Sequence, residues 1–315
     1  MNRIGVVVVA HNSEREIGAC LDSLPPGLET VVVDNASRDG TCAQVLRRPS
    51  VKLLANPWNR GFAAAANQGI GLLDCECVLL LNPDVELQGG LDALATACAG
   101  EGIAASAARL VDRQGRPQTG FMVRRFPTPL ALALEVMGVN RLWPGNPVNR
   151  RYRCLDLDPA LEAAVEQPAA ALLMIRREAW RRLGGFDESF YPVWFEDVDF
   201  CRRAAAAGYA MRYVPSAVAR HSGAHSVGRL PWAARERYWY GNLLRYAAKH
   251  FARSGLLAVC AALVLGSLFR MTFWTVRQRS LKPVLSYAGV VRLAGVCAFS
   301  GHGEGPGFSS ALAVQ

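Results

Sequence analysis

Four acidic side chains stand where they could do chemistry: Asp34, Asp84 and the adjacent pair Glu196-Asp197. Asp34 and Asp84 each follow a short apolar run, and the pair opens a stretch with helical spacing. A carboxylate can hold a divalent cation through its oxygens or take a proton from a reacting hydroxyl group. Each acid also has a purely structural interpretation, because Asp favours Asx turns and helix N-caps and acids favour helix N-termini. The elements around them decide between these interpretations.

The N-terminal third of the chain alternates short apolar runs with helical stretches. Runs that are apolar throughout are typical of parallel strands covered by helices on both faces. Ligands bind such sheets beyond the carboxyl ends of the strands, and three of the four runs lead to Asn12, Asp34 or Asp84. We therefore predict an α/β fold whose binding edge contains these three residues. The predicted strands are Ile4–Ala10, Glu29–Val33, Val51–Leu54 and Cys77–Leu81, with helices over about 14–24 and 62–73.

The second half is less regular before it becomes periodic again. Residues from about 104 to 168 are rich in Arg, Pro and Asn, which is typical of loops. A single histidine, His221, follows the last strand-like run; a lone histidine is usually structural or exposed, although imidazole is an acceptable Mn²⁺ ligand. The predicted elements are a strand at Ala169–Ile175, helices at Arg176–Leu183 and Phe195–Ala207, and a strand-like run at Met211–Val214.

A glycine-containing loop, Asn59-Arg60-Gly61-Phe62, precedes the helix that carries Asn67. Helix N-termini bind anions through free N–H groups and the helix dipole, and a glycine permits close approach of the backbone. The alternative is an ordinary turn with a capped helix. Residue types alone leave the two interpretations nearly even.

The positive charge is unevenly distributed. Of 35 Lys and Arg against 26 Asp and Glu, residues 1–228 hold 24 of each, whereas residues 229–315 hold 11 cations and only Glu236 and Glu304. A nucleic-acid-binding protein would carry its basic patches on the folded domain, so we exclude nucleic acid as a partner. A neutral body with a cationic, apolar tail suits an anionic membrane surface.

The cysteines and the N-terminus favour a protein that faces the cytosol. Nine scattered cysteines give neither a disulfide framework nor a zinc-finger spacing, which indicates reduced thiols. The apolar run after Arg3 lacks a small-residue cleavage site, so we expect a buried strand there and no signal peptide.

The tail has two segments of interest. At 100° per residue over Trp232–Arg253, basic residues fall on one arc and apolar ones on the other, which suits a helix lying in a bilayer interface; packing on the body is the alternative. Ser254–Phe269 then gives 16 uncharged residues, short of the roughly 17–25 needed to span, so we expect a re-entrant or in-plane helix. The two arcs are Arg235, Arg245, Lys249 and Arg253 against Trp232, Trp239, Leu243, Ala247 and Phe251.

Taken in order, the motifs over roughly residues 4–225 resemble family 2 glycosyltransferases of the GT-A fold, most closely the bacterial rhamnosyltransferase-like branch. Their joint order is far more specific than any one of them. The resemblance implies a Rossmann-like, mostly parallel sheet flanked by helices, followed here by an amphipathic, apolar helical tail. The motifs are VVVVAHN (Val6–Asn12), VVVDNASRDGT (Val31–Thr41), NPWNRGFAAAANQG (Asn56–Gly69), LLLNPD (Leu79–Asp84), GGFDESF (Gly184–Phe190), FEDVDFCRRAAAAGY (Phe195–Tyr209) and His221.

For the donor side, the resemblance implies a nucleotide sugar with Mg²⁺ or Mn²⁺ on its diphosphate. Asn82 replaces the first acid of the family's Asp-x-Asp motif, so the metal would be held by Asp84 and largely by substrate phosphates. His221, or alternatively His225, would complete the metal or diphosphate site. The residues implied to contact the donor are Asn12, Asp34, Asn59, Gly61, Asn67 and Asp84.

For the acceptor side, Asp197 matches the family's catalytic aspartate, the base that deprotonates the acceptor hydroxyl in an inverting transfer. Glu196 is its nearest rival. Asp199, two positions further on, points elsewhere on a helix and is expected to be structural. Trp194 is placed on the acceptor side, where it would stack on a sugar face, with a core aromatic as the alternative.

These features predict three segments: a nucleotide-sugar half (1–103), an acceptor and catalytic half (104–228) and a membrane-associating helical tail (229–315). The expected protein is a bacterial transferase on the cytoplasmic face of the inner membrane, with a glycan or lipid-linked acceptor. dTDP-rhamnose is the preferred donor, with UDP-hexoses and UDP-galactofuranose as alternatives. Other hypotheses are a catalytically silent binding module and, less favoured, a nucleotidyltransferase, since Ala10–Arg15 has no glycine.

Overall fold

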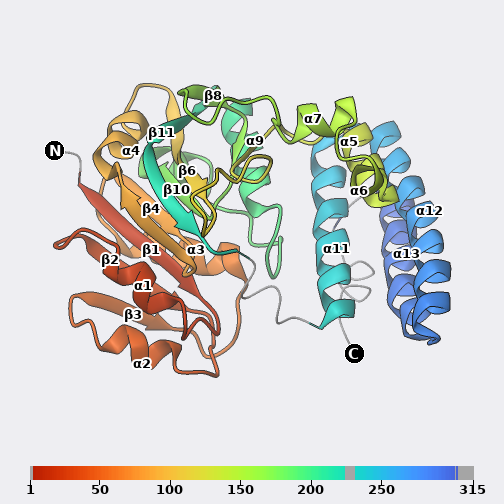
Figure 1. The fold of residues 1–315 in the computed structure, drawn as a ribbon, viewed down its shortest axis with the longest axis horizontal. Coiled ribbons are helices and arrows are strands. Elements are labelled where there is room, and N and C mark those ends of the chain that lie inside the picture. The colour runs from red at the N-terminus through yellow and green to blue at the C-terminus, as the bar shows by residue number, and fades with distance from the viewer. Residues whose placement is uncertain (1–2, 224–230, 302, 304–315) are drawn as a thin grey trace. The chain divides into compact units, whose positions relative to one another are not determined.

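The computed structural model describes residues 3–223, 231–301 and 303. The chain forms two compact units. The first holds Met1–Phe126, Arg153–Pro192 and Glu196–Gly228, and the second holds Pro127–Tyr152, Val193–Phe195 and Arg229–Gln315. The first unit contains the strands and the second is helical (Figure 1).

The first unit is an α/β unit, as predicted. Its helices are α1 (Ile17–Asp22), α2 (Thr41–Leu46), α3 (Phe62–Leu72), α4 (Leu91–Cys98), α8 (Arg177–Arg182) and α9 (Glu196–Ala206). Its strands are β1 (Ile4–Ala10), β2 (Glu29–Asp34), β3 (Val51–Ala55), β4 (Cys77–Leu81), β5 (Val85–Gly89), β6 (Ile103–Val111), β7 (Val123–Arg124), β8 (Ala163–Val165), β9 (Gln167–Pro168), β10 (Leu172–Arg176) and β11 (Ala210–His221).

The sheet runs in the order β3-β2-β1-β4-β10-β6-β11-β5, with β8 added on β11 and a separate β7-β9 pair. The four strands predicted from apolar runs form its parallel half, and Ala10 pairs with Asp34 at their carboxyl edge. β1, β2 and β4 are apolar and buried along nearly all their length, whereas the edge strand β3 is only half-buried and carries the exposed Lys52. The predicted parallel arrangement is therefore confirmed for this half.

The other half of the sheet brings distant segments together. β10 is antiparallel to both β4 and β6, and β11 lies parallel to β6. Beyond β4 the chain turns at Asn82, where the amide N–H of Val85 donates to the Asn82 carbonyl at 3.2 Å, and enters β5. Since β5 pairs antiparallel with β11, His221 comes opposite Val85, the residue after Asp84.

The second unit consists of helices: α5 (Pro129–Met137), α6 (Val139–Leu142), α7 (Pro147–Tyr152), α11 (Trp232–His250), α12 (Arg253–Gln278) and α13 (Lys282–Ser300). The start of α5 is set by its sequence, since Thr128 Oγ1 accepts the Ala131 N–H at 3.1 Å and Pro129 fits the first helical position. Gly138 ends it at a φ of 82°, a conformation that favours glycine. α12 packs against α5, α11 and α13.

One expectation for the tail is corrected, and the length of a second segment is revised. Trp232–Arg253 does form a helix up to His250, but Leu243, Ala247 and Arg245 are buried, and Asn242 Oδ1 accepts a hydrogen bond from Arg245. The apolar arc therefore faces protein, so α11 is not an interface helix. The next segment is longer than the 16 uncharged residues suggested, because the helix continues through Arg270 to Gln278. By length and composition, α12 and α13 could each cross a membrane, a test that buried core helices also pass.

Candidate functional site

Asp34 and Asn12 meet at the carboxyl edge of β1 and β2. The Ser37 N–H donates to Asp34 Oδ2 at 2.9 Å. Asn12 stabilises the loop that follows Asp34, because its Oδ1 accepts the Arg38 N–H at 2.8 Å. Asp34 is 2% exposed, and its Oδ1 has no hydrogen-bond partner among the described residues. Burial and the Asp34 charge raise the pKa of the nearby Cys42 thiol to about 11. A buried carboxylate oxygen without a donor is costly, so this oxygen is suited to a ligand N–H or O–H.

A network of amides fixes the Asn59–Gly61 loop. Asn59 Oδ1 accepts the N–H of Gly61 at 2.8 Å and Asn35 Nδ2 at 3.0 Å, while Asn35 also donates to the Gly61 carbonyl at 3.0 Å. Asn56 and Gln68 exchange two further hydrogen bonds below it. Sequence reasoning quoted Asn35 only as part of a motif and missed this role.

Gly61 is a position where glycine is required. Its φ is +83°, and a Cβ there would lie 2.9 Å from Tyr191 Cδ2 and 3.2 Å from the Pro192 carbonyl oxygen. The N–H of Phe62 donates to that carbonyl at 2.7 Å. The first amide of α3 is therefore occupied by protein, which argues against this amide as an anion site and leaves the loop itself as the candidate contact.

Asn67 holds a loop of the same unit. Its Oδ1 accepts the N–H of Phe186 at 2.9 Å and Trp180 Nε1 at 3.2 Å, and its Nδ2 donates to the Phe186 carbonyl at 2.8 Å and to Glu188 at 3.1 Å. Both polar atoms of its side chain are engaged, which favours a role for Asn67 in positioning this loop over the predicted donor contact.

Asp84 and His221 face each other across the β5–β11 pair. Nε2 of His221 lies 3.7 Å from Oδ2 of Asp84, and the two side chains are 7% and 10% exposed. The Ser222 N–H donates to the Asp84 carbonyl at 3.0 Å. The structure thus brings together the two residues predicted to share a metal, from segments far apart in the chain.

Gln118 and Phe121 hold the His221 ring. Gln118 Nε2 donates to the His221 carbonyl at 2.9 Å, so its Oε1 is the acceptor that faces Nδ1 at 2.8 Å. Nδ1 therefore carries a proton, and Nε2 is the nitrogen directed at Asp84. Phe121 stacks on the ring at 4.9 Å with planes 12° apart.

Neither Gln118 nor Phe121 was found from the sequence. They follow a turn in which Asp112 Oδ1 accepts the N–H groups of Gln114 and Arg116 at 2.8 and 3.0 Å, and these hydrogen bonds, with those to the Arg116 side chain, lower the pKa of Asp112. This turn returns the chain beside His221. No periodicity marks the region, so residue types gave no signal.

The donor set suits a divalent cation held by few protein ligands. A carboxylate and an imidazole that converge with little exposure are acceptable ligands for Mn²⁺. In the described ranges, no three His, Cys, Asp or Glu side chains cluster as ligands would. The arrangement therefore fits a metal that completes its shell with substrate phosphates and water. His225 lies outside the described residues.

Asp197 sits in the first turn of α9 with its carboxylate held by backbone amides. The N–H of Val198 donates to Oδ1 at 2.8 Å, and the N–H of Ala170 donates to Oδ2 at 3.2 Å, with Gln167 Nε2 at 3.4 Å. Burial raises the pKa of Asp197, while these amides and the charge of Arg124 oppose the rise. A carboxylate with donors on both oxygens and a raised pKa is suited to accepting a proton.

Glu196 is in a different state from its neighbour. It is 4% exposed, and its Oε2 has no hydrogen-bond partner in the described part of the chain. Burial first, and then the Asp197 charge, raise the pKa of Glu196 well above its usual range. The pKa of Glu196 is raised further than that of Asp197, and no described donor stabilises the ionised form at Oε2, which favours Asp197 over this rival as the base.

Asp199 has the structural role predicted for it. It is buried and its Oδ2 accepts Arg203 Nε at 2.7 Å, and Arg203 also donates to the carbonyls of Leu183 and Gly185 at 2.6 and 2.7 Å. Trp194 belongs to the second unit, where its φ is +80° and that of Phe195 is +73°. Such values are strained for aromatic residues, so this junction before α9 is under local constraint.

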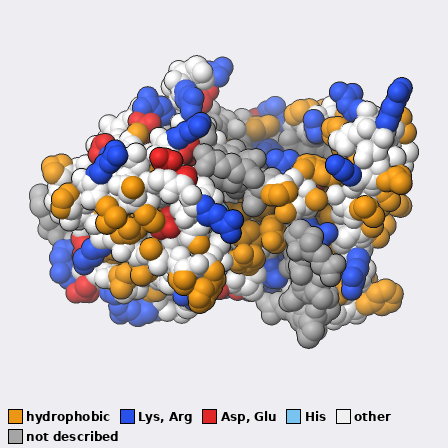
Figure 2. All heavy atoms as spheres, turned by 90° about the horizontal axis from the view of Figure 1, so that it is seen from below, with side chains coloured by type: hydrophobic (Ala, Val, Ile, Leu, Met, Phe, Trp, Pro, Cys, Tyr) orange, Lys and Arg blue, Asp and Glu red, His pale blue; other side chains and the backbone are white. Residues whose placement is uncertain are grey.

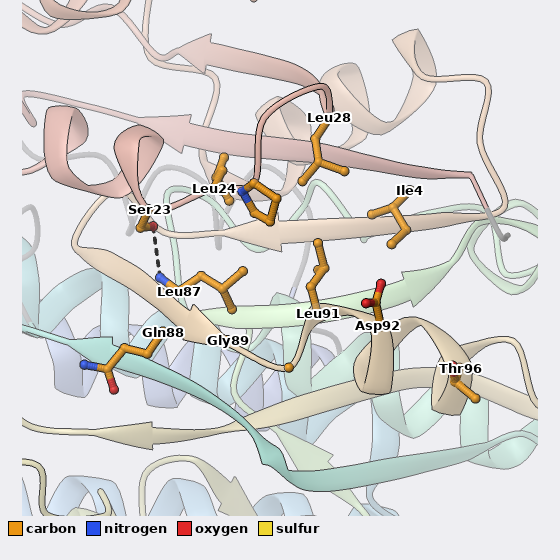
Figure 3. A pocket seen from close by; sticks show the side chains of 12 residues that line it. Ile4, Ser23, Leu24, Leu28, Leu87, Gln88, Gly89, Leu91, Asp92 and Thr96 are labelled. Atoms are coloured by element: carbon orange, nitrogen blue, oxygen red, sulfur yellow. Dashed lines mark hydrogen bonds between the residues drawn. The ribbon is translucent and has the colours of Figure 1, made fainter.

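A pocket of about 850 Å³ lies elsewhere in the first unit, between α1, β5 and α4 (Figure 3). Its walls include Ile4, Leu24, Leu28 and Leu91, and its Ser23 Oγ already accepts the Leu87 N–H at 3.0 Å. None of the predicted site residues lines it, so it is separate from the acids described above.

Comparisons with known proteins place these features in a family. Residues 5–128 match the model for glycosyl transferase family 2, and residues 167–298 match that for glycosyl transferase family group 2. The chain is 31% identical over 311 residues to the N-acetylglucosaminyl-diphospho-decaprenol L-rhamnosyltransferase of Mycobacterium tuberculosis, covering 89% of this chain and 97% of that protein. The chain belongs to glycosyltransferase family 2. It is therefore a glycosyltransferase and resembles the rhamnosyltransferase branch, as predicted.

Solved structures of similar fold are also glycosyltransferases. S. aureus TarS 1-349 in complex with UDP-GlcNAc has a TM-score of 0.54 at 15% identity, covering 98% of this chain and 90% of that one. The mannosyltransferase PcManGT from Pyrobaculum calidifontis, with GDP-Man and Mn²⁺, has a TM-score of 0.52 at 20% identity, covering 99% and 85%. These likenesses confirm the GT-A fold of the family 2 enzyme.

Proposed function

We propose that this family 2 enzyme is an inverting hexosyltransferase that moves rhamnose from dTDP-rhamnose to a lipid-linked or polysaccharide acceptor in bacterial cell-surface glycan synthesis. The observation that carries the proposal is the similarity, over 89% of the chain, to a rhamnosyltransferase whose name gives a diphospho-decaprenol acceptor. UDP-hexoses and UDP-galactofuranose are the alternative donors.

The nucleoside would bind at the carboxyl edge of β1 and β2. The buried Asp34 Oδ1 would accept a hydrogen bond from the nucleoside, which relieves the cost of its missing partner. Asn12 keeps the loop after Asp34 in place, and Asn59 with Gly61 would line the site from the side of α3.

Asp84 and His221 would hold Mg²⁺ or Mn²⁺ against the diphosphate of the donor. When bound, the cation neutralises the negative charge that develops on the leaving nucleoside diphosphate. Because the chain supplies two ligands, the metal would bind together with the donor and weakly without it.

Asp197 would take the proton from the acceptor hydroxyl as that oxygen attacks the anomeric carbon. The new C–O bond forms while the bond from the anomeric carbon to the phosphate oxygen breaks, and the nucleoside diphosphate leaves with the bonding electrons. Trp194 and Glu196 are the proposed acceptor-side residues.

The acceptor chemistry sets the location. An acceptor carried on a membrane lipid requires the site to work at the bilayer, and the cationic residues 229–315 suit an anionic leaflet. We therefore place the enzyme on the cytoplasmic face of the inner membrane, as a peripheral protein. Residues 1–103 would form its nucleotide-sugar half and residues 104–228 its acceptor half.

Donor-dependent release of nucleoside diphosphate tests the reaction. With dTDP-rhamnose, Mn²⁺ and a lipid-linked acceptor, the purified chain should release dTDP, and Asp197→Asn should lose transfer by about 10²–10⁴-fold. The variant should keep the donor-induced rise in melting temperature. Full turnover by Asp197→Asn would contradict the assignment of the base.

A catalytically silent binding module is the second candidate, because Asn82 replaces a metal-site acid. It predicts donor-induced stabilisation with no release of nucleoside diphosphate under any acceptor condition. The same assay therefore separates the two candidates.

A further inference from the structure

One face of α12 is exposed and uncharged along nearly the whole helix. The exposed positions recur every three or four residues from Ser254 to Val276, and no charged residue interrupts them. The large apolar side chains of this face, here called the α12 stripe, are between 41% and 74% exposed: Leu257, Leu265, Leu268, Phe269, Phe273 and Val276. Figure 2 shows orange hydrophobic side chains beside blue cations on the part of the molecule that carries these helices.

The opposite face of α12 is packed against its own unit. A Cβ on Gly255 would lie 2.8 Å from Pro129 Cγ, and one on Gly266 would lie 2.2 Å from the Val136 carbonyl oxygen. α5 therefore runs along α12 from near its start to beyond its middle, and two small residues allow the close contact.

This packing is incompatible with α12 crossing a bilayer. The end of α5 carries Glu135, which accepts a hydrogen bond from Asn140 at 2.7 Å, and the exposed Arg141 follows in α6. A Cβ built on Gly138 would lie 3.8 Å from Nη2 of Arg270 on α12, so the end of α5 comes close to this guanidinium. If α12 spanned the hydrocarbon core, these charged and polar groups would be carried into it, which is costly.

The ends of the stripe are cationic. Residues 253–300 contain six Lys and Arg and no Asp or Glu. Arg253 lies at one end of α12, and Arg277, Arg279 and Lys282 are exposed around the turn into α13. A flat apolar surface with cations at its edge matches the hydrocarbon boundary and phosphates of an anionic leaflet.

We infer that the α12 stripe docks on an anionic lipid bilayer with the helix axis lying in the membrane plane. The inference deepens the location in the proposed function and rests on it only for the choice of leaflet. The stripe buries its phenylalanine and leucine side chains among the acyl chains near the headgroups, and the cations of the α12–α13 turn contact lipid phosphates.

Flotation of the full chain with vesicles tests the surface. Binding to phosphatidylglycerol-containing vesicles should exceed binding to pure phosphatidylcholine, and Phe269→Ser/Phe273→Ser should weaken it by about tenfold or more. Leu46→Ser/Leu72→Ser is the matched control, since Leu46 and Leu72 are exposed apolar residues of the first unit. The charge test compares Arg277→Glu/Lys282→Glu with Arg47→Glu/Arg113→Glu, which changes exposed cations away from the stripe.

Each outcome decides for or against the surface. We expect weaker binding by Phe269→Ser/Phe273→Ser and by Arg277→Glu/Lys282→Glu, and unchanged binding by the two control variants. Equal binding by all four variants overturns the inference. A full chain that elutes at twice its mass, and becomes monomeric with Phe269→Ser/Phe273→Ser, would show that a second copy covers the stripe and would also overturn it.

A protease site inserted after Ser280 distinguishes the in-plane helix from a span. When the chain is added outside sealed anionic vesicles, the α12–α13 turn should stay cleavable, because it lies at the outer surface. Protection of the turn would mean that it has crossed the bilayer, which contradicts the inference. Transfer to a short-chain acceptor should be unchanged in the stripe variants, so failure of vesicle binding and failure of the reaction are separate results.

Discussion

Nε2 of His221, at the end of β11, lies 3.7 Å from Oδ2 of Asp84, at the turn between β4 and β5. The contact depends on the antiparallel register of β5 and β11, which sets His221 opposite Val85. Neither residue would be a convincing ligand alone, since one is a strand-end aspartate and the other a lone histidine. Their convergence gives the proposed metal one oxygen and one nitrogen ligand.

His221→Ala should weaken Mn²⁺ binding by about tenfold or more, because a ligand is lost. Titration of Mn²⁺ into the chain in the presence of nucleoside diphosphate, followed by electron paramagnetic resonance, measures it. His250→Ala is the control, since His250 belongs to the second unit. Equal Mn²⁺ affinity in His221→Ala and the unsubstituted chain would remove His221 from the site.

Gln118→Leu should reduce the same Mn²⁺ affinity by about 10–100-fold, because residues that orient a metal ligand contribute that much. The substitution removes the acceptor for Nδ1–H and the donor to the His221 carbonyl. Nitrogen NMR of the imidazole gives an independent readout, since the preference for the Nδ1–H tautomer should weaken.

Gln114→Leu is the control for Gln118→Leu, because Gln114 is an exposed residue of the preceding turn. A Gln118→Leu chain that keeps both the tautomer and the Mn²⁺ affinity would show that Gln118 only packs. A chain with lost affinity and an unchanged tautomer would also count against orientation as the cause.

Site residues could be predicted from the sequence where their position depends on a nearby segment of the chain, and not where it depends on a contact with a distant segment. Asp34 and Asn12 were found because each follows its own apolar strand, and parallel strands align their carboxyl ends. Gln118 was missed because it reaches His221 from an irregular segment. Asn67 was assigned to the donor from its motif, although hydrogen bonds to Phe186, across the fold, occupy it.

The tail shows the same limit. The wheel over Trp232–Arg253 gave the helix correctly, because periodicity is local. The predicted environment of that helix was wrong, because Arg245 is buried in the protein, whereas the helical wheel predicted that it would face lipid headgroups. Periodicity indicates that α11 has an apolar and a basic face, whereas the packing of α12 and α13 determines which of these faces is buried.

Glu196→Gln should stabilise the fold near neutral pH and lose that advantage in acid. The folded-state pKa of Glu196 is raised by burial above that of the unfolded chain, so the folded state binds the proton more tightly. The cost of keeping Glu196 buried therefore grows as pH rises above the unfolded pKa, whereas Gln carries no such cost. We expect a melting temperature higher by roughly 2–4 °C for each 1 kcal/mol gained.

Thermal unfolding of both chains between pH 4 and pH 8 measures the Glu196 effect. Glu188→Gln is the control, because Glu188 is an exposed glutamate of the same unit. Parallel melting curves at all pH values would mean that Glu196 titrates alike in the folded and unfolded states. A Glu196→Gln chain that is less stable at neutral pH would show that the carboxylate is ionised and paired.

Asp34→Asn should lower the affinity for the nucleotide-sugar donor by about 10–100-fold, the range expected for a hydrogen bond to a charged group of roughly 1.5–3 kcal/mol. The substitution keeps the shape and the acceptor for the Ser37 N–H but removes the negative charge from the buried Oδ1. Stability without ligand should be kept or increased, because a buried carboxylate oxygen without a donor destabilises the free protein.

Calorimetric titration with dTDP-rhamnose and with dTDP measures the loss of affinity for Asp34→Asn. The affinity for both ligands should fall equally if the contact is to the nucleoside. Asp92→Asn, in the first turn of α4, is the control. If the Asp34→Asn chain binds dTDP as tightly as this control, the nucleoside does not contact Asp34.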